Sequence, residues 1–201
     1  MGITGCTNPA PFTGGSDQED DASLRSRILE SYQRLPNGAN AAWYEQTAMG
    51  HEGVAAARAV GRARGIGTVD VYIATAAGLP NGTLLAAVQA DLQERREIAV
   101  DVQVKAPAAV EMDVSAELAV REGTDFSAVK AAAEQALASF FSGRRLGGPV
   151  LLAELGDLLY HVEGVENYRL LAPAADLAAE DGTLPMLGRV TVTEMEADDD
   201  V

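Results

Sequence analysis

Histidine and cysteine, the side chains that most often hold metals or act as nucleophiles, are scarce in this sequence. The 201 residues include two histidines and a single cysteine, so no internal disulfide or thiolate cluster can form. His51 and His161 do not share a metal-binding spacing. We expect His161, which follows a predicted helix, to contact the C-terminus of that helix. Cys6 lies in a Gly- and Pro-rich stretch and is interpreted as a free thiol.

Two short patterns resemble known sites but lack essential positions. Asp17, Glu19 and Asp21 imitate the first ligands of a calcium loop, but Ala22 replaces its glycine and Ile28 its bidentate glutamate. The glycines at positions 61, 65 and 67 precede neither a predicted helix nor a Lys-Ser or Lys-Thr pair, which favours a hairpin turn over a phosphate loop. No Gly-x-Ser-x-Gly elbow occurs. The sequence therefore predicts no catalytic, cofactor or metal site and no small-molecule substrate.

Three arginines stand out in an otherwise acidic sequence. Arg58, Arg62 and Arg64 alternate with alanines, which predicts that they share one face of a strand. One interpretation is a solvated face balanced by nearby carboxylates, since such surface ion pairs are common and weak. The other is a complementary patch that meets an acidic segment of another copy and contributes steering and register. Both interpretations stay open at this point.

The charge of the chain restricts its partners. The formal net charge is −15, so long-range repulsion disfavours phosphate backbones and anionic lipid. No apolar run approaches the length of a membrane-spanning helix. Nucleic acid and membrane are therefore not expected partners. Part of the acidity is local, because Glu194, Glu196 and Asp198 to Asp200 crowd the end of the sequence, and residues 196–201 are expected to form a disordered tail.

The N-terminal quarter predicts an arm followed by two helices. Residues 1–16 are rich in Gly and Pro, which favours an extended arm. Over residues 17–50 we expect a helical hairpin. Its first helix carries the stripe Leu24, Ile28 and Tyr32, and its second is capped by Asn40 and holds Trp43.

Two small α/β modules are predicted to follow. Residues 51–107 read as β-β-α-β, with strands near 54–64, 69–73 and 100–104 and a helix from about residue 82. Residues 108–195 read as β-α-α-β-β, opening with an uninterrupted alternation over 110–120. The last strand is expected only at 189–193, after a loop containing Pro185. The predicted fold class is α+β with mainly antiparallel or mixed sheets.

Several motifs in collinear order resemble a known family. Gly14 and Gly15 precede Asp17 and Glu19, and an Arg-x-Arg pair follows at positions 25 and 27. Further along come Gly65-Ile-Gly-Thr-Val-Asp-Val71, Val102-Gln-Val-Lys-Ala-Pro107, Leu146-Gly-Gly-Pro-Val150 and Val162-Glu-Gly-Val165. Together these segments resemble the C-terminal half of the Mu-like baseplate J family. The positions Gly14, Gly15, Asp17, Glu19, Arg25 and Arg27 are carried over as structural signature positions only.

The resemblance implies a non-catalytic component of a contractile phage tail or tail-like particle. Such a protein would help to build the baseplate wedge around the central hub and would contact other wedge and hub proteins, with further copies of itself as additional candidates. Its location would be the virion baseplate, after assembly in the host bacterial cytoplasm. Family members usually carry another N-terminal region of comparable size, so both a fragment and a short gene stay open.

Two other classes of function are kept as alternatives. The first is a carboxylate-based hydrolase, which requires a deep pocket with at least two convergent ionisable groups. The second is a small adaptor or binding domain unrelated to phages. The identity of the neighbouring genes distinguishes this adaptor class from a baseplate protein, whose neighbours should encode other tail proteins.

Overall fold

The structure, a computed structural model, describes residues 40–195 and five residues of a preceding helix, Asp21, Leu24, Arg25, Ile28 and Leu29. The chain divides into two units, residues 1–35 and 36–201. Because the five earlier residues are helical, the first predicted helix is confirmed at those positions. The predicted arm, the rest of that helix and the acidic tail lie outside the described residues.

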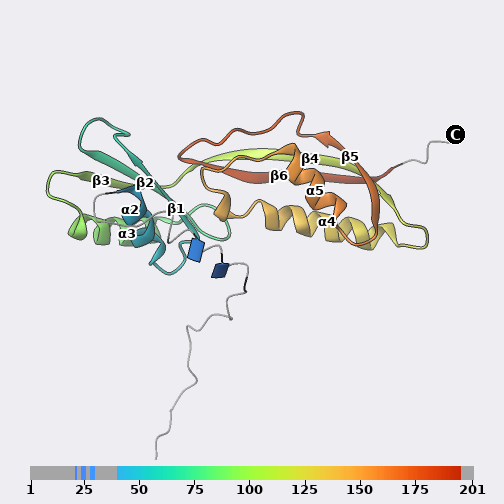
Figure 1. Cartoon of the computed structure of the whole chain (residues 1–201), viewed down its shortest axis with the longest axis horizontal. Helices are drawn as coiled ribbons and strands as arrows, with labels where there is room; N and C mark the ends of the chain where they lie inside the picture. The colour runs from blue at the N-terminus through green and yellow to red at the C-terminus, as the bar shows by residue number, and fades with distance from the viewer. Residues whose placement is uncertain (1–20, 22–23, 26–27, 30–39, 196–201) are drawn as a thin grey trace, which may run out of the picture. The chain divides into compact units, whose positions relative to one another are not determined.

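Residues 41–105 form a three-stranded sheet with two helices, which we call the central module (Figure 1). Helix α2 spans Ala41–Met49 and α3 spans Gly82–Arg95. The strands are β1 (Ala56–Gly61), β2 (Thr68–Ala74) and β3 (Asp101–Lys105). Strand β2 lies in the middle, antiparallel to β1 and parallel to β3. Because β2 and β3 are parallel neighbours, the chain must cross over between them, and α3 forms this crossover connection.

Asparagine side chains begin both helices of the central module. Asn40 accepts a hydrogen bond from the backbone N–H of Trp43, and Asn81 accepts one from that of Leu84. These are N-cap contacts that satisfy otherwise unpaired helical donors. The cap predicted at Asn40 is therefore confirmed. The helices cover a core of seven buried residues, Tyr44, Ala48, Val71, Ile73, Val88, Leu92 and Val102.

Residues 108–194 form the C-terminal module, a second three-stranded sheet with two helices. Its strands are β4 (Ala108–Val120), β5 (Val165–Ala172) and β6 (Thr183–Glu194). Strand β4 is central, antiparallel to β5 and parallel to β6. Helices α4 (Phe126–Phe140) and α5 (Leu152–Tyr160) pack on the sheet, and a 3-10 helix, η1 (Gly143–Arg145), follows α4.

Strand β4 explains why this module folds around one apolar layer. Met112, Val114, Ala116 and Leu118 are buried, and the residues between them are exposed or half-buried. Alternation with period two places every second side chain on the helix-covered face. Val129, Ala133 and Leu137 of α4 face them at helical spacing, within a core of thirteen buried residues. The strand and helix predicted for residues 110–140 are confirmed.

Two local predictions were wrong. Strand β6 begins at Thr183, six residues before the predicted start at Arg189, and it contains Pro185. Proline is tolerated there because β6 is an edge strand, where one N–H can be lost without breaking the ladder. Strand β1 ends at Gly61, so Arg62 and Arg64 lie in the β1–β2 turn and do not share a strand face with Arg58. Arg62 has a φ of 62° there.

The fold class is confirmed as α+β with mixed sheets, since each sheet contains one parallel and one antiparallel pairing. Each module has its own core. A small third cluster, formed around Ala74, Leu146 and Leu184, joins side chains from both modules. Gly143 has no room for a side chain, because an added Cβ would lie 1.8 Å from the carbonyl oxygen of Thr75.

Candidate assembly interface

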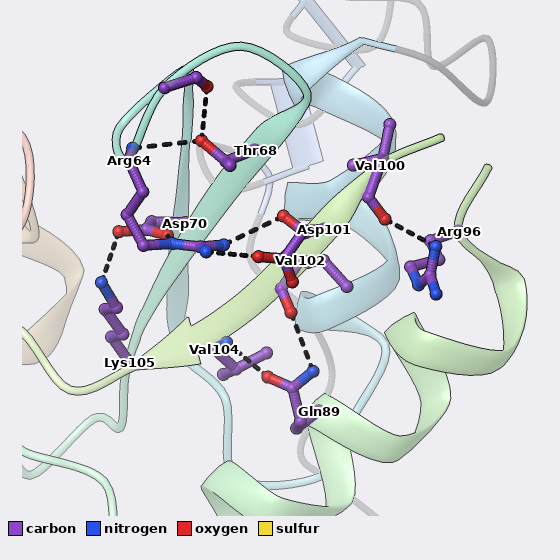
Figure 2. Close-up of polar contacts among 11 residues, drawn as sticks. Arg64, Thr68, Asp70, Gln89, Arg96, Val100, Asp101, Val102, Val104 and Lys105 are labelled. Atoms are coloured by element: carbon purple, nitrogen blue, oxygen red, sulfur yellow. Dashed lines mark hydrogen bonds and ion pairs between the residues drawn. The ribbon is translucent and has the colours of Figure 1, made fainter. Parts of the chain in front are cut away.

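A buried carboxylate organises one end of the central sheet. Asp70, on β2, has a side chain that is 3% exposed, and its two oxygens accept hydrogen bonds from Arg64 Nε at 2.7 Å and Lys105 Nζ at 2.5 Å (Figure 2). Burial by itself would raise the pKa of Asp70. The hydrogen bonds and positive charges of Arg64 and Lys105 outweigh burial, so this pKa lies below its ordinary value. The carboxylate therefore stays ionised and holds both cations.

Arg64 extends this network from the β1–β2 turn to β3. Its guanidinium contacts the carboxylate of Asp101 and donates to the Asp101 carbonyl at 3.0 Å. Its backbone N–H donates to the hydroxyl of Thr68 at 3.1 Å, and that hydroxyl donates to the carbonyl of Gly65 at 2.7 Å. The backbone N–H of Asp101 donates to the carbonyl of Gly67 at 2.8 Å. The turn is thus attached to β3 through side chain and backbone.

The neighbouring α3–β3 loop is fixed by Arg96. Its Nη1 donates to the carbonyls of Glu97, Ile98 and Val100, at 3.1, 3.2 and 2.6 Å. One guanidinium nitrogen therefore donates hydrogen bonds to three carbonyls of a five-residue loop. Without these bonds the carbonyls would need water as their donor. Figure 2 shows Arg96 directed at Val100 beside the start of β3.

These two fixed loops each expose an isoleucine. Ile66, in the turn, is 94% exposed, and Ile98, in the loop, is 100% exposed. The hydrogen bond between Gly67 and Asp101 brings the two loops to the same end of the sheet. We call Ile66 and Ile98 the isoleucine tip. Burying such a side chain stabilises a complex by about 1.5–3 kcal/mol, so an apolar pair on immobilised loops is suited to bind another protein.

Gln89 and Glu45 occupy the outer edges of the same sheet. The Gln89 amide, on α3, donates to the Val102 carbonyl at 3.0 Å and accepts from the Val104 N–H at 2.7 Å. Glu45, on α2 and only 5% exposed, accepts from the Ala59 N–H at 3.1 Å. Both edge strands are therefore partly blocked against pairing with a foreign strand. The sheet edges of this module are less suited to binding than its tip.

The structure separates the three arginines that the sequence grouped. Arg58 Nε pairs with Asp181 Oδ1 at 2.7 Å, and Arg64 pairs with Asp70 and Asp101. Arg62 is exposed and forms no ion pair with a residue that the structure describes. Two of the three positive charges are thus balanced within the chain. A role of Arg58, Arg62 and Arg64 at an interface stays a prediction, and Arg62 is the member best placed for it.

The histidines contact carboxylates. His51 Nε2 lies 3.0 Å from Asp91 Oδ2, and His161 Nδ1 lies 3.2 Å from Asp157 Oδ1. His161 Nδ1 also lies 2.8 Å from the Asp157 carbonyl in the last turn of α5, which is the predicted contact with the helix C-terminus. Among residues 40–195 and the five earlier described positions, no group of three His, Cys, Asp or Glu side chains could hold a metal. In that same part of the chain, no helix is long and apolar enough to cross a bilayer.

Sequence reasoning missed the isoleucine tip and offered little signal for it. Ile66 lies between two glycines and Ile98 follows a charged run, so neither belongs to a periodic apolar pattern. An isoleucine inside a predicted turn was the available hint. Of the signature positions, Arg25 is helical and exposed. Gly14, Gly15, Asp17, Glu19 and Arg27 lie outside the described residues.

Comparison with known proteins assigns both modules. Residues 36–106 match the family model of the Baseplate J-like central domain, and residues 112–193 match that of the Baseplate J-like protein C-terminal domain. The chain belongs to the baseplate J-like family. The resemblance noticed in the sequence is thereby confirmed.

Two similar proteins indicate how much of a longer protein this chain corresponds to. Baseplate protein J of Escherichia phage P2 is 29% identical over 163 residues, which cover 79% of this chain and 54% of that protein. Phage-like element PBSX protein XkdT of Bacillus subtilis is 24% identical over 192 residues, covering 90% of this chain and 55% of that protein. The chain therefore spans about half the length of these curated relatives.

A solved structure shares the fold. A chain in the cryo-EM structure of the anti-feeding prophage baseplate superposes with a TM-score of 0.58 at 14% identity, covering 87% of this chain and 43% of that one. At this identity the likeness concerns the fold, since one fold can serve unrelated functions.

Proposed function

We propose that this baseplate J-like chain is a structural, non-catalytic part of a contractile tail baseplate. It would help to build the wedge around the hub, in contact with other baseplate proteins. The observation that carries the proposal is the match of both modules, in order, to the two baseplate J-like domains. The similar phage P2 protein is a baseplate protein and the similar solved chain belongs to a prophage baseplate, which supports a baseplate as the location of this chain.

The isoleucine tip supports an assembly role on physical grounds. The protein uses a buried ion pair, a three-carbonyl arginine contact and two loops to present Ile66 and Ile98 to solvent. Loops that are already ordered lose little entropy when they bind. A stable interface buries upwards of about 1,000 Å², so two isoleucines form an anchor within a larger contact surface.

The larger of two pockets found among the described residues does not support the hydrolase alternative. A surface pocket of about 570 Å³ lies beside the N-terminus of α3, and Glu52 is the only ionisable residue that lines it. Hydrolysis by a carboxylate mechanism needs two such groups facing one bond.

A binding experiment tests the proposal. The purified chain is immobilised and titrated with each tail protein encoded by the neighbouring genes. We expect at least one to bind, and the double variant Ile66→Asp/Ile98→Asp to weaken that binding at least tenfold. Leu79→Asp is the matched control, because Leu79 is 46% exposed and lies in a different turn of the central module.

One result would count against the proposed function, and another against the part of the isoleucine tip in it. Absence of binding to every neighbouring tail protein would contradict the assembly role itself. Equal binding by the double isoleucine variant and the wild type would leave the assembly role intact and remove the tip from it.

A further inference from the structure

A small basic pocket lies on the C-terminal module, away from the isoleucine tip. It has a volume of about 460 Å³ and is formed by the end of α4, η1 and the loop after it. Its polar lining consists of two arginines and two serines, Arg144, Arg145, Ser139 and Ser142, and no carboxylate lines it. In a chain with a net charge of −15, such a lining is unusual and selects negative ligands.

The two arginines have different roles. Arg145 is occupied, since it donates to the carbonyls of Phe140 and Pro149, pairs with Glu154 at 2.8 Å and lies 3.5 Å above the Phe140 ring. Arg145 thus forms a rigid wall. Arg144 is exposed and has no ion pair within the described part of the chain. Its guanidinium is therefore available, beside two hydroxyl donors, for a carboxylate.

Carboxylates are dense in two segments of the sequence, residues 17–21 and residues 194–200. In the second of these, five acidic residues, Glu194, Glu196, Asp198, Asp199 and Asp200, occupy the seven positions that begin with the last residue of β6, a stretch we call the acidic segment. Its charge complements that of the pocket. Ser and Arg side chains can bind a carboxylate with both hydrogen bonds and charge, so one aspartate of this segment matches the pocket chemically.

The topology separates the acidic segment from the pocket on the same molecule. The loop after η1 meets the start of β6, where Gly147 N–H donates to the Thr183 carbonyl at 2.8 Å. The acidic segment begins at the other end of β6, which has 12 residues and therefore extends about 36 Å. Residues 195–201 span at most about 24 Å when fully extended. This reach is shorter than β6, which favours a contact with a second copy over a return to the same pocket.

We infer that the pocket around Arg144 binds the acidic segment, residues 194–200, of a second copy of this chain. The contact joins two different surfaces, so it is head-to-tail and can continue from copy to copy into a ring or an open array. This inference rests on the assembly role proposed above and gives it one specific partner, another copy of the same protein.

Sedimentation velocity of the purified chain and of charge-reversed variants tests the inference. Wild type associates in a concentration-dependent manner at about 50 mM salt and dissociates at about 500 mM, because screening shortens the reach of exposed charges. Arg144→Glu, and separately Asp198→Lys/Asp199→Lys/Asp200→Lys, each weaken association at least tenfold. A mixture of these two variants associates again, since the reversed charges attract. Arg189→Glu changes an exposed arginine outside the pocket by the same charge and associates as wild type does.

The outcomes of this experiment test the contact between copies independently of the proposed assembly with other tail proteins. Wild-type association by either charge-reversed variant, failure of the mixture to associate, or a monomeric wild type at low salt would overturn the inference. None of these results affects binding to neighbouring tail proteins, which is measured separately. Circular dichroism verifies that every variant is folded.

Discussion

The central and C-terminal modules have similar sheets but are stabilised in different ways. The C-terminal module buries thirteen residues in its apolar core, and the central module buries seven. Among the described residues, the two buried charged side chains, Glu45 and Asp70, both belong to the central module. The smaller core is thus supplemented by polar contacts between side chains and backbone.

This difference indicates that apolar burial and polar contacts have different structural roles in the two modules. Apolar burial is strong but non-directional, whereas hydrogen bonds and ion pairs fix the position of particular loops. The central module uses Asp70, Arg64 and Arg96 to hold the loops that carry the isoleucine tip. The C-terminal module relies on its larger apolar core. Five predictions, based on four substitutions, can break or sharpen this comparison.

The largest effect is expected in the apolar core of the C-terminal module. Leu137→Ala removes a fully buried side chain and should lower the free energy of unfolding by about 3 kcal/mol. Urea denaturation followed by circular dichroism measures it. Leu171→Ala is the control, since Leu171 is 50% exposed in the same module. Equal losses for the two variants would show that this core is not the main source of stability.

The next effect should come from the buried carboxylate of the central module. Asp70→Ala leaves Lys105 and Arg64 without their shared partner. Because their side chains are 35% and 25% exposed, water can partly replace it, and we expect a loss of about 2 kcal/mol. Asp101→Ala should cost much less in the same urea titration, because Asp101 is 61% exposed. A reversed order would mean that the surface partner of Arg64 dominates.

Acid should reduce the stabilising effect of Asp70 but not that of Leu137. The pKa of Asp70 in the folded protein lies below its ordinary value of 3.8. Its stabilising contribution is therefore fully present above that value and is lost as the pH falls through the folded pKa. The stability difference between wild type and Asp70→Ala should shrink below about pH 4, while that of Leu137→Ala persists. A constant Asp70 difference down to pH 2.5 would contradict the assigned ion pair.

A smaller loss is expected at the edge of the central sheet. Gln89→Leu keeps the bulk of the side chain but removes both hydrogen bonds to β3, at a cost of about 1 kcal/mol. Hydrogen exchange should locate the change at the Val104 amide. Gln93→Leu, on an exposed position of the same helix, is the control. Unchanged exchange at Val104 would show that Gln89 does not protect this edge.

The comparison also explains which features the sequence could predict. The alternation of β4 and the stripe of α4 are periodic and local, so their positions were predicted closely. The contacts of Gln89 and Glu45 join residues 13 to 15 positions apart through side chain and backbone, and no sequence period reports them. Arg62 and Arg64 were misplaced because alternation continued past Gly61, where the backbone turns. The boundary between modules at residue 107 stays a prediction.

The smallest effect is expected at Tyr44, in the core of the central module. Its hydroxyl is buried without a hydrogen-bond partner among the described residues. Burial, and then the negative charge of Glu97, raise the pKa of Tyr44, so the phenol stays neutral. Tyr44→Phe removes an unsatisfied polar group and keeps the ring contact with Trp43. The free energy of unfolding should therefore stay the same or rise by up to about 1 kcal/mol.

Thermal and urea unfolding of Tyr44→Phe decide between two views of this core. A neutral or stabilising result means that the polar groups which stabilise the central module are those that contact its loops and sheet edges. A loss of more than about 1 kcal/mol would mean that the hydroxyl is hydrogen-bonded in solution. In that case the polar reinforcement of the central module extends into its core, and its difference from the C-terminal module is larger than the two cores alone indicate.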